Sequence, residues 1–468
     1  MLVLLGIACA ALAGCHSFKP LPDGLAVAGP DRPAARVEFL ADRTWVEPDG
    51  QRRVEQEIFD RLFELIDGAR SLIVADLFLY NDWQGPVPET TRALSSELTE
   101  RLLEKKASTP GIRIVMITDP VNTLYGGLAS AQFDALSAAG VSVVQTNLDP
   151  LRDSNVLYSP LWRLFVKPLG NDPGGILPNP IGPGDVSLRT YLKLFNFKAN
   201  HRKTLIADND GELVAMVMSA NPHDGSSAHR NAAVLFDGMA VLDLLASENA
   251  VLAMSGAPLV DASPWRQEGD DDAAMTVRVV TEREILNAIV AELATVGDGD
   301  HVDLMMFYLS SRDVIDALLG AQRSGARVRV LLDPNKDAFG RQKSGVPNRP
   351  VARELDGAGI PVRWCDTHGE QCHAKTLMVQ RADGRATLIT GSANLTRRNL
   401  NNLNLETDVV VNAPSKSAFM RAALLYFDQA WLNLDRRQAS VEYDLYRDDS
   451  IWSRIRYWFM EFSGFSSF

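Results

Sequence analysis

The chain is short of positive charge, of long apolar runs and of cysteine. Its 47 basic residues are outnumbered by 59 acidic ones, and the net charge of −12 argues against nucleic acid as the main partner, although a local basic groove can exist on an acidic protein. After the first 15 residues, no segment looks long and apolar enough to span a membrane, and none resembles a long disordered tail. The remaining composition, 46% hydrophobic and 23% charged over 468 residues, is ordinary for a folded protein with more than one domain or a duplicated one.

The amino terminus carries a short apolar segment, residues 1–15, that we do not expect to be part of the fold. Its last residues, Leu-Ala-Gly before Cys15, resemble a bacterial lipoprotein signal in which Cys15 receives lipid, although the usual preceding basic residues are missing. A lipidated Cys15 would tether the protein to a membrane from outside the cytoplasm. His16 replaces the aspartate linked with inner-membrane retention, which favours the periplasmic face of the outer membrane of a Gram-negative bacterium. A secretory signal cleaved elsewhere, or an apolar start without meaning, is the alternative.

The scarcity of cysteine leaves Cys365 and Cys372 as the only thiols of the expected mature chain. In an oxidising periplasm such a close pair is a candidate disulfide, and two free buried thiols are the alternative. Together with His368 and His373, the two cysteines also have the residue types of a zinc site. The internal repeat explains His373 better, so we expect no metal.

The chain repeats one plan, because segments of the first half return in the same order in the second. The paired segments are 69–80 with 300–310, 111–122 with 325–336, 138–147 with 357–366, 200–208 with 372–380, and 214–221 with 386–394. Amphipathic helical patterns lie between these apolar strands, at 55–69 and 282–294. This alternation predicts an α/β fold of two tandem halves, each a mixed or parallel sheet flanked by helices, related by a pseudo-twofold axis.

The predicted boundaries follow from changes in composition along the chain. The first half contains a Pro- and Gly-rich but apolar insertion without a counterpart, which we expect to be an ordered flap near the site. The carboxyl end is strongly aromatic, and it is either a terminal helix docked on the core or an interfacial segment resting on lipid. The parts are the signal 1–15, the first half 16–256 with its flap 149–194, the linker 257–273, the second half 274–440 and the tail 441–468.

Each half contains a histidine two residues before a lysine, in NHRKTLIAD from Asn200 and in CHAKTLMVQ from Cys372. Residues i and i+2 of a strand point to the same side. The residues that share a side are His201 with Lys203, and His373 with Lys375. Two such strands brought together about a twofold axis would surround one point with two imidazoles and two ammonium groups. This suits a phosphate: the lysines neutralise its oxygens, one imidazole attacks phosphorus, and the other protonates the leaving oxygen.

The pattern resembles that of the phospholipase D superfamily, whose motif His-x-Lys-x4-Asp is followed by Gly-Ser-x-Asn. Each histidine is followed by an asparagine at a similar distance, since Asn221 follows His201 by 20 residues and Asn394 follows His373 by 21. The resemblance covers nearly the whole expected mature chain. It implies a phosphohistidine intermediate and no metal or other cofactor, with His201 as nucleophile and His373 as general acid. The site residues that it implies are His201, Lys203, Asn221, His373, Lys375, Ser392 and Asn394.

The family often has a carboxylate about 30 residues beyond each histidine, which orients the imidazole. The aligned positions in this chain are Asn231 and Glu406. We expect Glu406 to lie beside His373 and to favour its charged form, which suits a proton donor. Asn231 would then lie beside His201 and leave it closer to neutral and nucleophilic.

Two positions depart from the family motif: Gln380 replaces the aspartate that is Asp208 in the first half, and Met218 replaces a glycine. The motif aspartate lies five residues past the lysine, so on a strand it faces away from the pocket and is predicted to be structural. A degenerate, inactive second half is the alternative. Asp119 and Asp333, at matching strand ends, are predicted to cap the following turns rather than to touch the site.

Fold and motif alone do not choose between phospholipid and nucleic acid as the substrate. Three features favour lipid: the expected membrane tether, the apolar flap just before His201, and the aromatic tail. Residues 200–203, Asn-His-Arg-Lys, also look like the first motif of bacterial cardiolipin synthases. The sequence therefore predicts a phosphodiesterase or phosphatidyltransferase that acts on phospholipids and has no nucleic-acid partner. The alternatives are a periplasmic nuclease of the same superfamily and a catalytically inactive lipoprotein scaffold.

Overall fold

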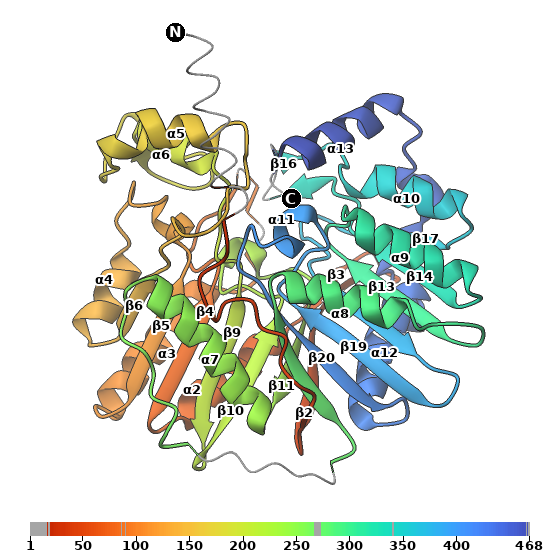
Figure 1. Cartoon of the computed structure of the whole chain (residues 1–468), viewed down its shortest axis with the longest axis horizontal. Coiled ribbons are helices and arrows are strands. Elements are labelled where there is room, and N and C mark those ends of the chain that lie inside the picture. The colour runs from red at the N-terminus through yellow and green to blue at the C-terminus, as the bar shows by residue number, and fades with distance from the viewer. Residues whose placement is uncertain are drawn as a thin grey trace.

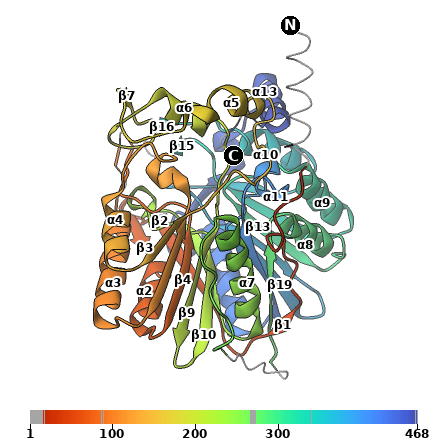
Figure 2. The same ribbon diagram turned by 60° about the vertical axis from the view of Figure 1, so that its left-hand side comes forward.

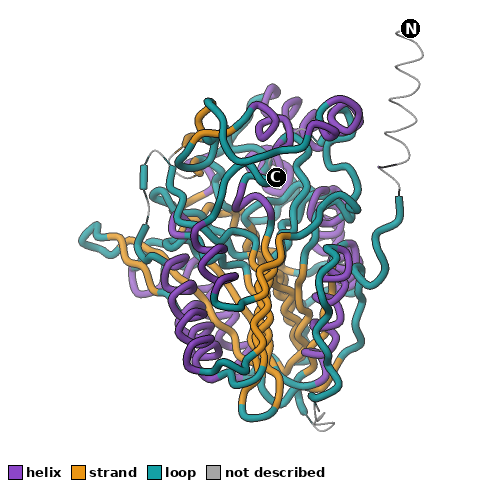
Figure 3. Tube along the Cα trace, turned by 90° about the vertical axis from the view of Figure 1, so that its left-hand side faces the viewer, coloured by secondary structure: helices purple, strands orange, loops and turns teal. Residues whose placement is uncertain are grey.

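A computed structural model describes residues 16, 19–85, 87–88, 90–265, 273–338, 341–464 and 466. The expected signal with Cys15 lies outside these residues, and so do residues 266–272 of the predicted linker 257–273. Two sheets lie face to face, with helices on their outer sides (Figures 1 and 3). The α/β class and the two helix-flanked sheets predicted from the sequence are confirmed.

The first half forms an eight-stranded sheet in the order β3-β2-β11-β10-β9-β4-β5-β6. Strands β4, β5 and β6 run parallel, and the other neighbours are antiparallel. The strands are β2 (Val37–Val46), β3 (Arg52–Glu55), β4 (Leu72–Leu77), β5 (Arg113–Thr118), β6 (Ser142–Gln145), β9 (Lys203–Asn209), β10 (Glu212–Met218) and β11 (Asn231–Phe236).

The second half forms a nine-stranded sheet in the order β1-β12-β20-β19-β18-β13-β14-β17-β21. From β12 to β17 it repeats the order and the strand directions that the first sheet has from β2 to β6, which is the arrangement expected of a duplicated unit. The strands are β1 (Arg32–Pro33), β12 (Thr276–Thr281), β13 (His301–Met306), β14 (Arg327–Leu332), β17 (Val362–Cys365), β18 (Lys375–Gln380), β19 (Arg385–Gly391), β20 (Thr407–Pro414) and β21 (Ser440–Glu442).

Helices cover the outer face of each sheet because their apolar residues recur every three or four positions. In α2, for example, the residues Ile58, Leu62, Leu65 and Ile66 are buried against the first sheet. The outer helices are α2 (Ile58–Gly68), α3 (Leu94–Ser108) and α4 (Ala131–Ala138) on the first sheet, and α8 (Arg283–Leu293), α9 (Arg312–Arg323) and α10 (Asn348–Gly357) on the second. The core between the sheets is closed by α7 (Met239–Met254) and α12 (Ala418–Trp431).

The flap and the tail lie together at one end of the molecule, at the top of Figures 1 and 2. The flap contains two short helices and a small hairpin. The tail ends in a helix whose Tyr457 is buried and donates a hydrogen bond to the carbonyl of Ser310, so the tail docks on the core. The remaining elements are α5 (Ser159–Phe165), β7 (Leu177–Pro178), β8 (Asp185–Val186), α6 (Leu188–Leu194), β15 (Asp337–Ala338), β16 (Arg341–Gln342), α11 (Arg397–Leu400) and α13 (Ile451–Ser463), with 3₁₀ turns at 120–123, 167–169, 224–226, 434–436 and 443–446.

Among the described residues, no helix combines the length and the apolar character that crossing a membrane requires.

Candidate active site

The two histidines meet where the halves join, and each is held by the backbone of the other half. The N–H of His201 donates to the carbonyl of Leu405, and the N–H of His373 donates to the carbonyl of Arg230, both at 2.8 Å. Two matching β-bridges, Asn200 with Leu405 and Arg230 with Cys372, frame these contacts. The backbone exchange is reciprocal, so the two motifs are arranged about a local twofold axis.

The two His-x-Lys pairs form a single buried cluster, the arrangement that the sequence predicts for them. Lys203 donates to the carbonyl of His201 and Lys375 to that of His373, each at 2.6 Å, which turns both ammonium groups back toward their histidines. Burial and then the charges of both lysines lower the pKa of His201 well below its ordinary value. Burial also lowers the pKa of His373, with contributions from both lysines and from His201. The four groups therefore act on one another electrostatically across the interface between the halves.

Two phenylalanines, which the sequence analysis missed, form the walls of the pocket. Phe78 packs edge-on against His201 with 4.6 Å between ring centroids, and the ammonium of Lys203 lies 5.0 Å from the same ring. On the other side, Phe307 lies 5.0 Å from the ring of His373 and 5.3 Å from the ammonium of Lys375. Both rings follow the corresponding strands β4 and β13, so their matched positions in the repeat were a signal that could have identified them.

The residues that orient the imidazoles cross over between the halves, and the pairing expected from the sequence is wrong. Nδ1 of His201 lies 2.9 Å from the carboxylate of Glu406, and Nδ1 of His373 lies 3.1 Å from Oδ1 of Asn231. The expected pairing kept each partner in its own half. The physical reason for the exchange is that β11 begins at Asn231 and β20 directly follows Glu406, and the start of each strand lies at the histidine of the opposite half.

Glu406 is surrounded by hydrogen-bond donors. Its oxygens accept from Nδ1 of His201, from the hydroxyl of Ser392 at 2.5 Å and from the amide of Asn399. Burial raises the pKa of Glu406 to about 8, and the charge of Lys203 and these donors oppose the rise. The donors fit the ionised carboxylate. An ionised Glu406 accepts from Nδ1 of His201, so the proton of the neutral imidazole is on Nδ1 and Nε2 is unprotonated.

Asn231 has a similar but neutral environment. Its Oδ1 accepts from the hydroxyl of Ser219 at 3.0 Å, in the place that Ser392 occupies beside Glu406. Ser219 was not among the predicted site residues, although it stands where Ser392 stands in the repeat. The carboxylate is thus beside His201 and the amide beside His373, which supports His201 as the nucleophile for a reason opposite to the one given by the sequence.

Two aspartates at matching strand ends hold the residue before each histidine. Asp119 accepts from the N–H of Val121 at 2.7 Å and from that of Asn200 at 2.6 Å. Asp333 accepts from the N–H of Asn335 at 2.7 Å and from that of Cys372 at 2.8 Å. The predicted turn caps are confirmed, and both carboxylates also fix the backbone that leads into the catalytic strands.

The other motif residues divide into structural and pocket groups. Asp208 accepts hydrogen bonds from three successive backbone N–H groups, those of residues 70–72, which confirms its structural role. Gln380 takes the corresponding place at the end of β18, and Met218 is buried in the core. Asn221 accepts from the N–H of Leu79 at 3.2 Å. Oδ1 of Asn394 is buried and has no hydrogen-bond partner among the described residues, so it is available to a ligand.

Cys365 and Cys372 form a disulfide that connects the end of β17 to the residue before His373. Each sulfur is therefore bonded to the other, so in this structure neither is a free thiolate. His373 faces the pocket with Lys375.

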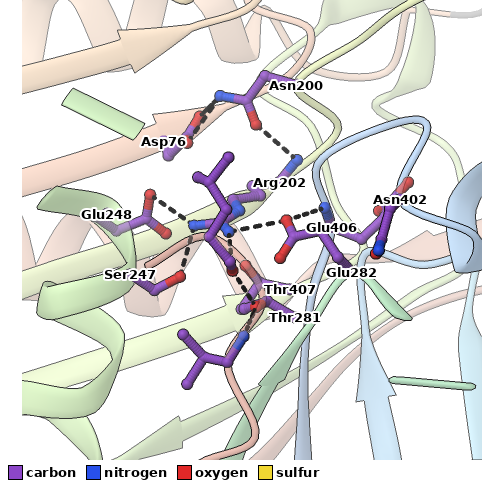
Figure 4. A network of polar contacts seen from close by, with 12 residues as sticks. Asp76, Asn200, Arg202, Ser247, Glu248, Thr281, Glu282, Asn402, Glu406 and Thr407 are labelled. Carbon is purple, nitrogen blue, oxygen red and sulfur yellow. Dashed lines mark hydrogen bonds and ion pairs between the residues drawn. The ribbon is translucent and has the colours of Figure 1, made fainter. Parts of the chain in front are cut away.

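A buried ionic network surrounds Arg202, in the segment between His201 and the start of β9 (Figure 4). Arg202 is fully buried and forms ion pairs with Glu282 at 2.9 Å and with Glu248 at 3.5 Å. The carboxylate of Glu282 also accepts from the backbone N–H of Glu406 at 3.2 Å. Arg202 belongs to the first half and Glu282 to the second, so this network fixes the partner of His201 across the interface.

Replacing Arg202 with methionine should lower the free energy of unfolding by about 3–5 kcal/mol, because Glu282 and Glu248 would stay buried without their cation. Chemical denaturation of the purified protein would measure the loss. The exposed Arg385, paired with Asp383, offers a control: Arg385→Met should cause no measurable change. Equal stability of the two variants would contradict a structural role for the Arg202 network.

The depressed pKa of Lys203 predicts how anion binding depends on pH. Burial lowers this pKa to about 7, and the charge of Glu406 opposes the shift. A bound oxyanion would restore the protonated form, so binding above about pH 7 takes up a proton. We expect the affinity for tungstate, titrated calorimetrically from pH 6 to 9, to weaken above about pH 7 by up to tenfold per pH unit. Lys203→Arg, which stays charged, should reduce this slope, and the remaining slope belongs to Lys375, whose pKa burial also lowers. A pH-independent affinity of the unaltered protein would refute the assignment.

Comparison with known proteins agrees with this geometry. A family model described as "Cardiolipin synthase, PLD-like domain" matches residues 275–431. The fold is similar to that of a phosphatidylserine synthase from Haemophilus influenzae Rd KW20, with 12% identity and a TM-score of 0.53 over 95% of this chain and 93% of that one. No curated protein matches the sequence.

Two further solved structures show weaker similarity. A polyphosphate kinase from Porphyromonas gingivalis matches 92% of this chain with 14% identity and a TM-score of 0.47, and this chain spans 53% of that enzyme's length. Nuc from Salmonella typhimurium, a phospholipase D family member, matches 36% of this chain and 99% of its own with 19% identity and a TM-score of 0.28. The family model identifies residues 275–431 as a phospholipase D-like domain, and the resemblance to the phospholipase D superfamily is confirmed for this part of the chain.

Proposed function

We propose that this protein is a phosphodiesterase or phosphatidyltransferase that acts on phospholipids through a phosphohistidine. The observation that carries the chemistry is the single buried pocket in which Glu406 orients His201, while His373 and both lysines lie around the same point. Neutral histidine, a phosphate-binding pair of lysines and a second imidazole are the parts that displacement at a phosphodiester requires.

In the proposed reaction, Nε2 of His201 attacks phosphorus and the bond from phosphorus to the leaving oxygen breaks. His373 carries a proton on both nitrogens once the anionic substrate is bound, because the phosphate favours the charged imidazole; it gives the proton on Nε2 to that oxygen and becomes neutral, with Nδ1 still donating to Asn231. An acceptor, water or a lipid alcohol, then returns a proton to His373 as its oxygen attacks phosphorus and the bond to His201 breaks. Lys203 and Lys375 neutralise the phosphate oxygens, and the negative substrate restores the positive charges that burial disfavours in the empty pocket.

A lipid substrate is supported by an apolar roof, formed by residues 149–198 and α13, at one end of the molecule (Figures 1 and 2). Among the described residues, twenty large apolar side chains are exposed; nine lie between Leu157 and Phe195, and six lie on α13. The end of α13 touches the flap, since a side chain at Gly464 would collide with the carbonyl of Ser154. Exposed apolar surface concentrated at one end is typical of a surface that contacts membrane or protein.

The proposal includes a membrane location. Lipid attached to Cys15 would hold the protein on the periplasmic face of the outer membrane, and the apolar roof would rest on the same leaflet. The exposed Trp452 and Trp458 of α13, with Arg454 and Arg456 beside them, have the side chains favoured at a lipid–water boundary. The substrate would then come from the leaflet that carries the tether.

The test is mass spectrometry of lipids after the mature domain is incubated with vesicles of phosphatidylglycerol and phosphatidylethanolamine. We expect phosphatidic acid or cardiolipin with the intact protein and neither with His201→Ala. The product separates hydrolysis from transfer. If neither product forms but single-stranded DNA is cleaved by the same preparation, the enzyme is a nuclease and the lipid assignment is wrong.

A further inference from the structure

A third histidine, His229, lies beside the pocket and was not part of either motif. It is 2% exposed, and its ring centroid is 5.7 Å from that of His373. The backbone N–H of Gln371 points at its Nδ1 at a distance of 3.3 Å. An Nδ1 that accepts this bond is unprotonated, so neutral His229 carries its proton on Nε2 and can act as a donor there.

The other side of the pocket has an asparagine at the corresponding place. Asn404 precedes Glu406 by two residues, as His229 precedes Asn231, and its Oδ1 accepts from the N–H of Ala199 at 3.1 Å. Asn404 therefore performs the same backbone contact for the strand of His201 that His229 performs for the strand of His373. Accepting this backbone N–H requires only one acceptor atom, which asparagine also has. The imidazole of His229 is therefore not needed for the contact, and it is present only on the side of His373.

Two further groups make the side of His373 more polar than that of His201. Tyr308 follows Phe307, whereas Leu79 follows Phe78 at the matching position. Lys343 donates to the hydroxyl of Tyr308 and lies 5.5 Å from the ring of Phe307. Burial lowers the pKa of His229, and the cationic groups Lys375, Arg52 and Lys343, which come from both halves, lower it further.

We infer that His229, Tyr308 and Lys343 form the pocket for the alcohol that leaves and for the alcohol or water that replaces it. This inference rests on the proposed function. In a displacement in line with Nε2 of His201, the leaving oxygen lies on the opposite side of phosphorus, which is the side of His373. His229 donates from Nε2 to this oxygen while His373 gives it a proton, the bond from phosphorus to oxygen breaks, and phosphorus stays bonded to His201. The acceptor enters the same pocket and loses its proton to His373.

His229→Asn tests the inference, because asparagine at Asn404 already makes the same backbone contact. The variant would be compared with the intact protein on phosphatidylglycerol and on phosphatidyl-p-nitrophenol, whose leaving group needs no protonation. We expect kcat/KM, which covers departure of the alcohol, to fall about 100-fold for phosphatidylglycerol and about twofold at most for the nitrophenyl ester. Asn404→Ala is the control: it loosens the strand of His201 and should lower both values by the same factor.

Equal losses on both lipids with His229→Asn would make His229 a structural residue, and no loss on either would overturn the inference as well. If the intact protein cleaves neither lipid, the proposed substrate has failed, and the same ratio is measured on single-stranded DNA and bis(p-nitrophenyl) phosphate. A selective loss on DNA would support the leaving-group pocket for that diester, and an equal loss would overturn it. A melting temperature within about 2 °C of the unaltered protein would show that the asparagine is accommodated.

Discussion

Replacing His201 with glutamine should lower kcat/KM by at least about 10⁵-fold on any phosphodiester that the protein cleaves. Nε2 of this residue is the nitrogen that bonds to phosphorus, and glutamine has no comparable nucleophile. The side chain is buried between Phe78 and Glu406, and a glutamine of similar size should leave the fold intact. The measurement is steady-state turnover of a chromogenic diester, together with a thermal unfolding curve.

His301→Gln provides the matched control, since His301 begins strand β13 outside the pocket. It should turn over the same diester at the unaltered rate. Residual activity of His201→Gln within tenfold of the unaltered protein would show that His201 is not the nucleophile, and His373 would then be the residue to test in its place.

Replacing His373 with glutamine should separate formation of the phosphohistidine from its breakdown. The nucleophile and its carboxylate remain, so a nitrophenyl diester should still release one equivalent of nitrophenol. The resulting phosphohistidine should then persist, because no group accepts the proton of the attacking water. With an ordinary alkyl diester, whose alcohol must be protonated, we expect kcat to fall about 10³- to 10⁴-fold.

Peptide mass spectrometry after rapid quenching would locate the phosphoryl adduct. We expect the added mass on the peptide that contains His201. An adduct found instead on the peptide of His373 in His201→Gln, with none on His201 in His373→Gln, would reverse the two roles.

The sequence was sufficient for the site's main parts, because a repeat contains information twice. The two His-x-Lys pairs were predicted to lie on strands; the structure begins β9 at Lys203 and β18 at Lys375, so each histidine lies two residues before its strand. The prediction that the four side chains come together is nevertheless correct. The structural role of Asp208 and the turn caps of Asp119 and Asp333 also followed from the alternation of side chains along a strand and from the turn after it.

The partners of the histidines could not be predicted in the same way. Alignment of the halves shows which residues correspond, but it does not show which half supplies a contact at the interface. For this reason Glu406 was correctly predicted to contact an imidazole, but that of His373 was expected and that of His201 is found. The ion pairs of Arg202 could not be predicted for a different reason. The side chain between His201 and Lys203 points away from the site, and its contacts depend on how the two halves pack against each other.

Each histidine is oriented by a residue of the other half, and this exchange has an evolutionary consequence. A single unit of this kind contains a histidine and a partner residue that cannot reach each other, so it would function only as a pair of identical copies. In such a pair, any change in the partner residue would alter both imidazoles at once. Joining two units in one chain removes that restriction, and here one copy keeps a carboxylate, Glu406, while the other has an amide, Asn231. Fusion thus allows nucleophile and acid to be optimised separately, which symmetry would otherwise forbid.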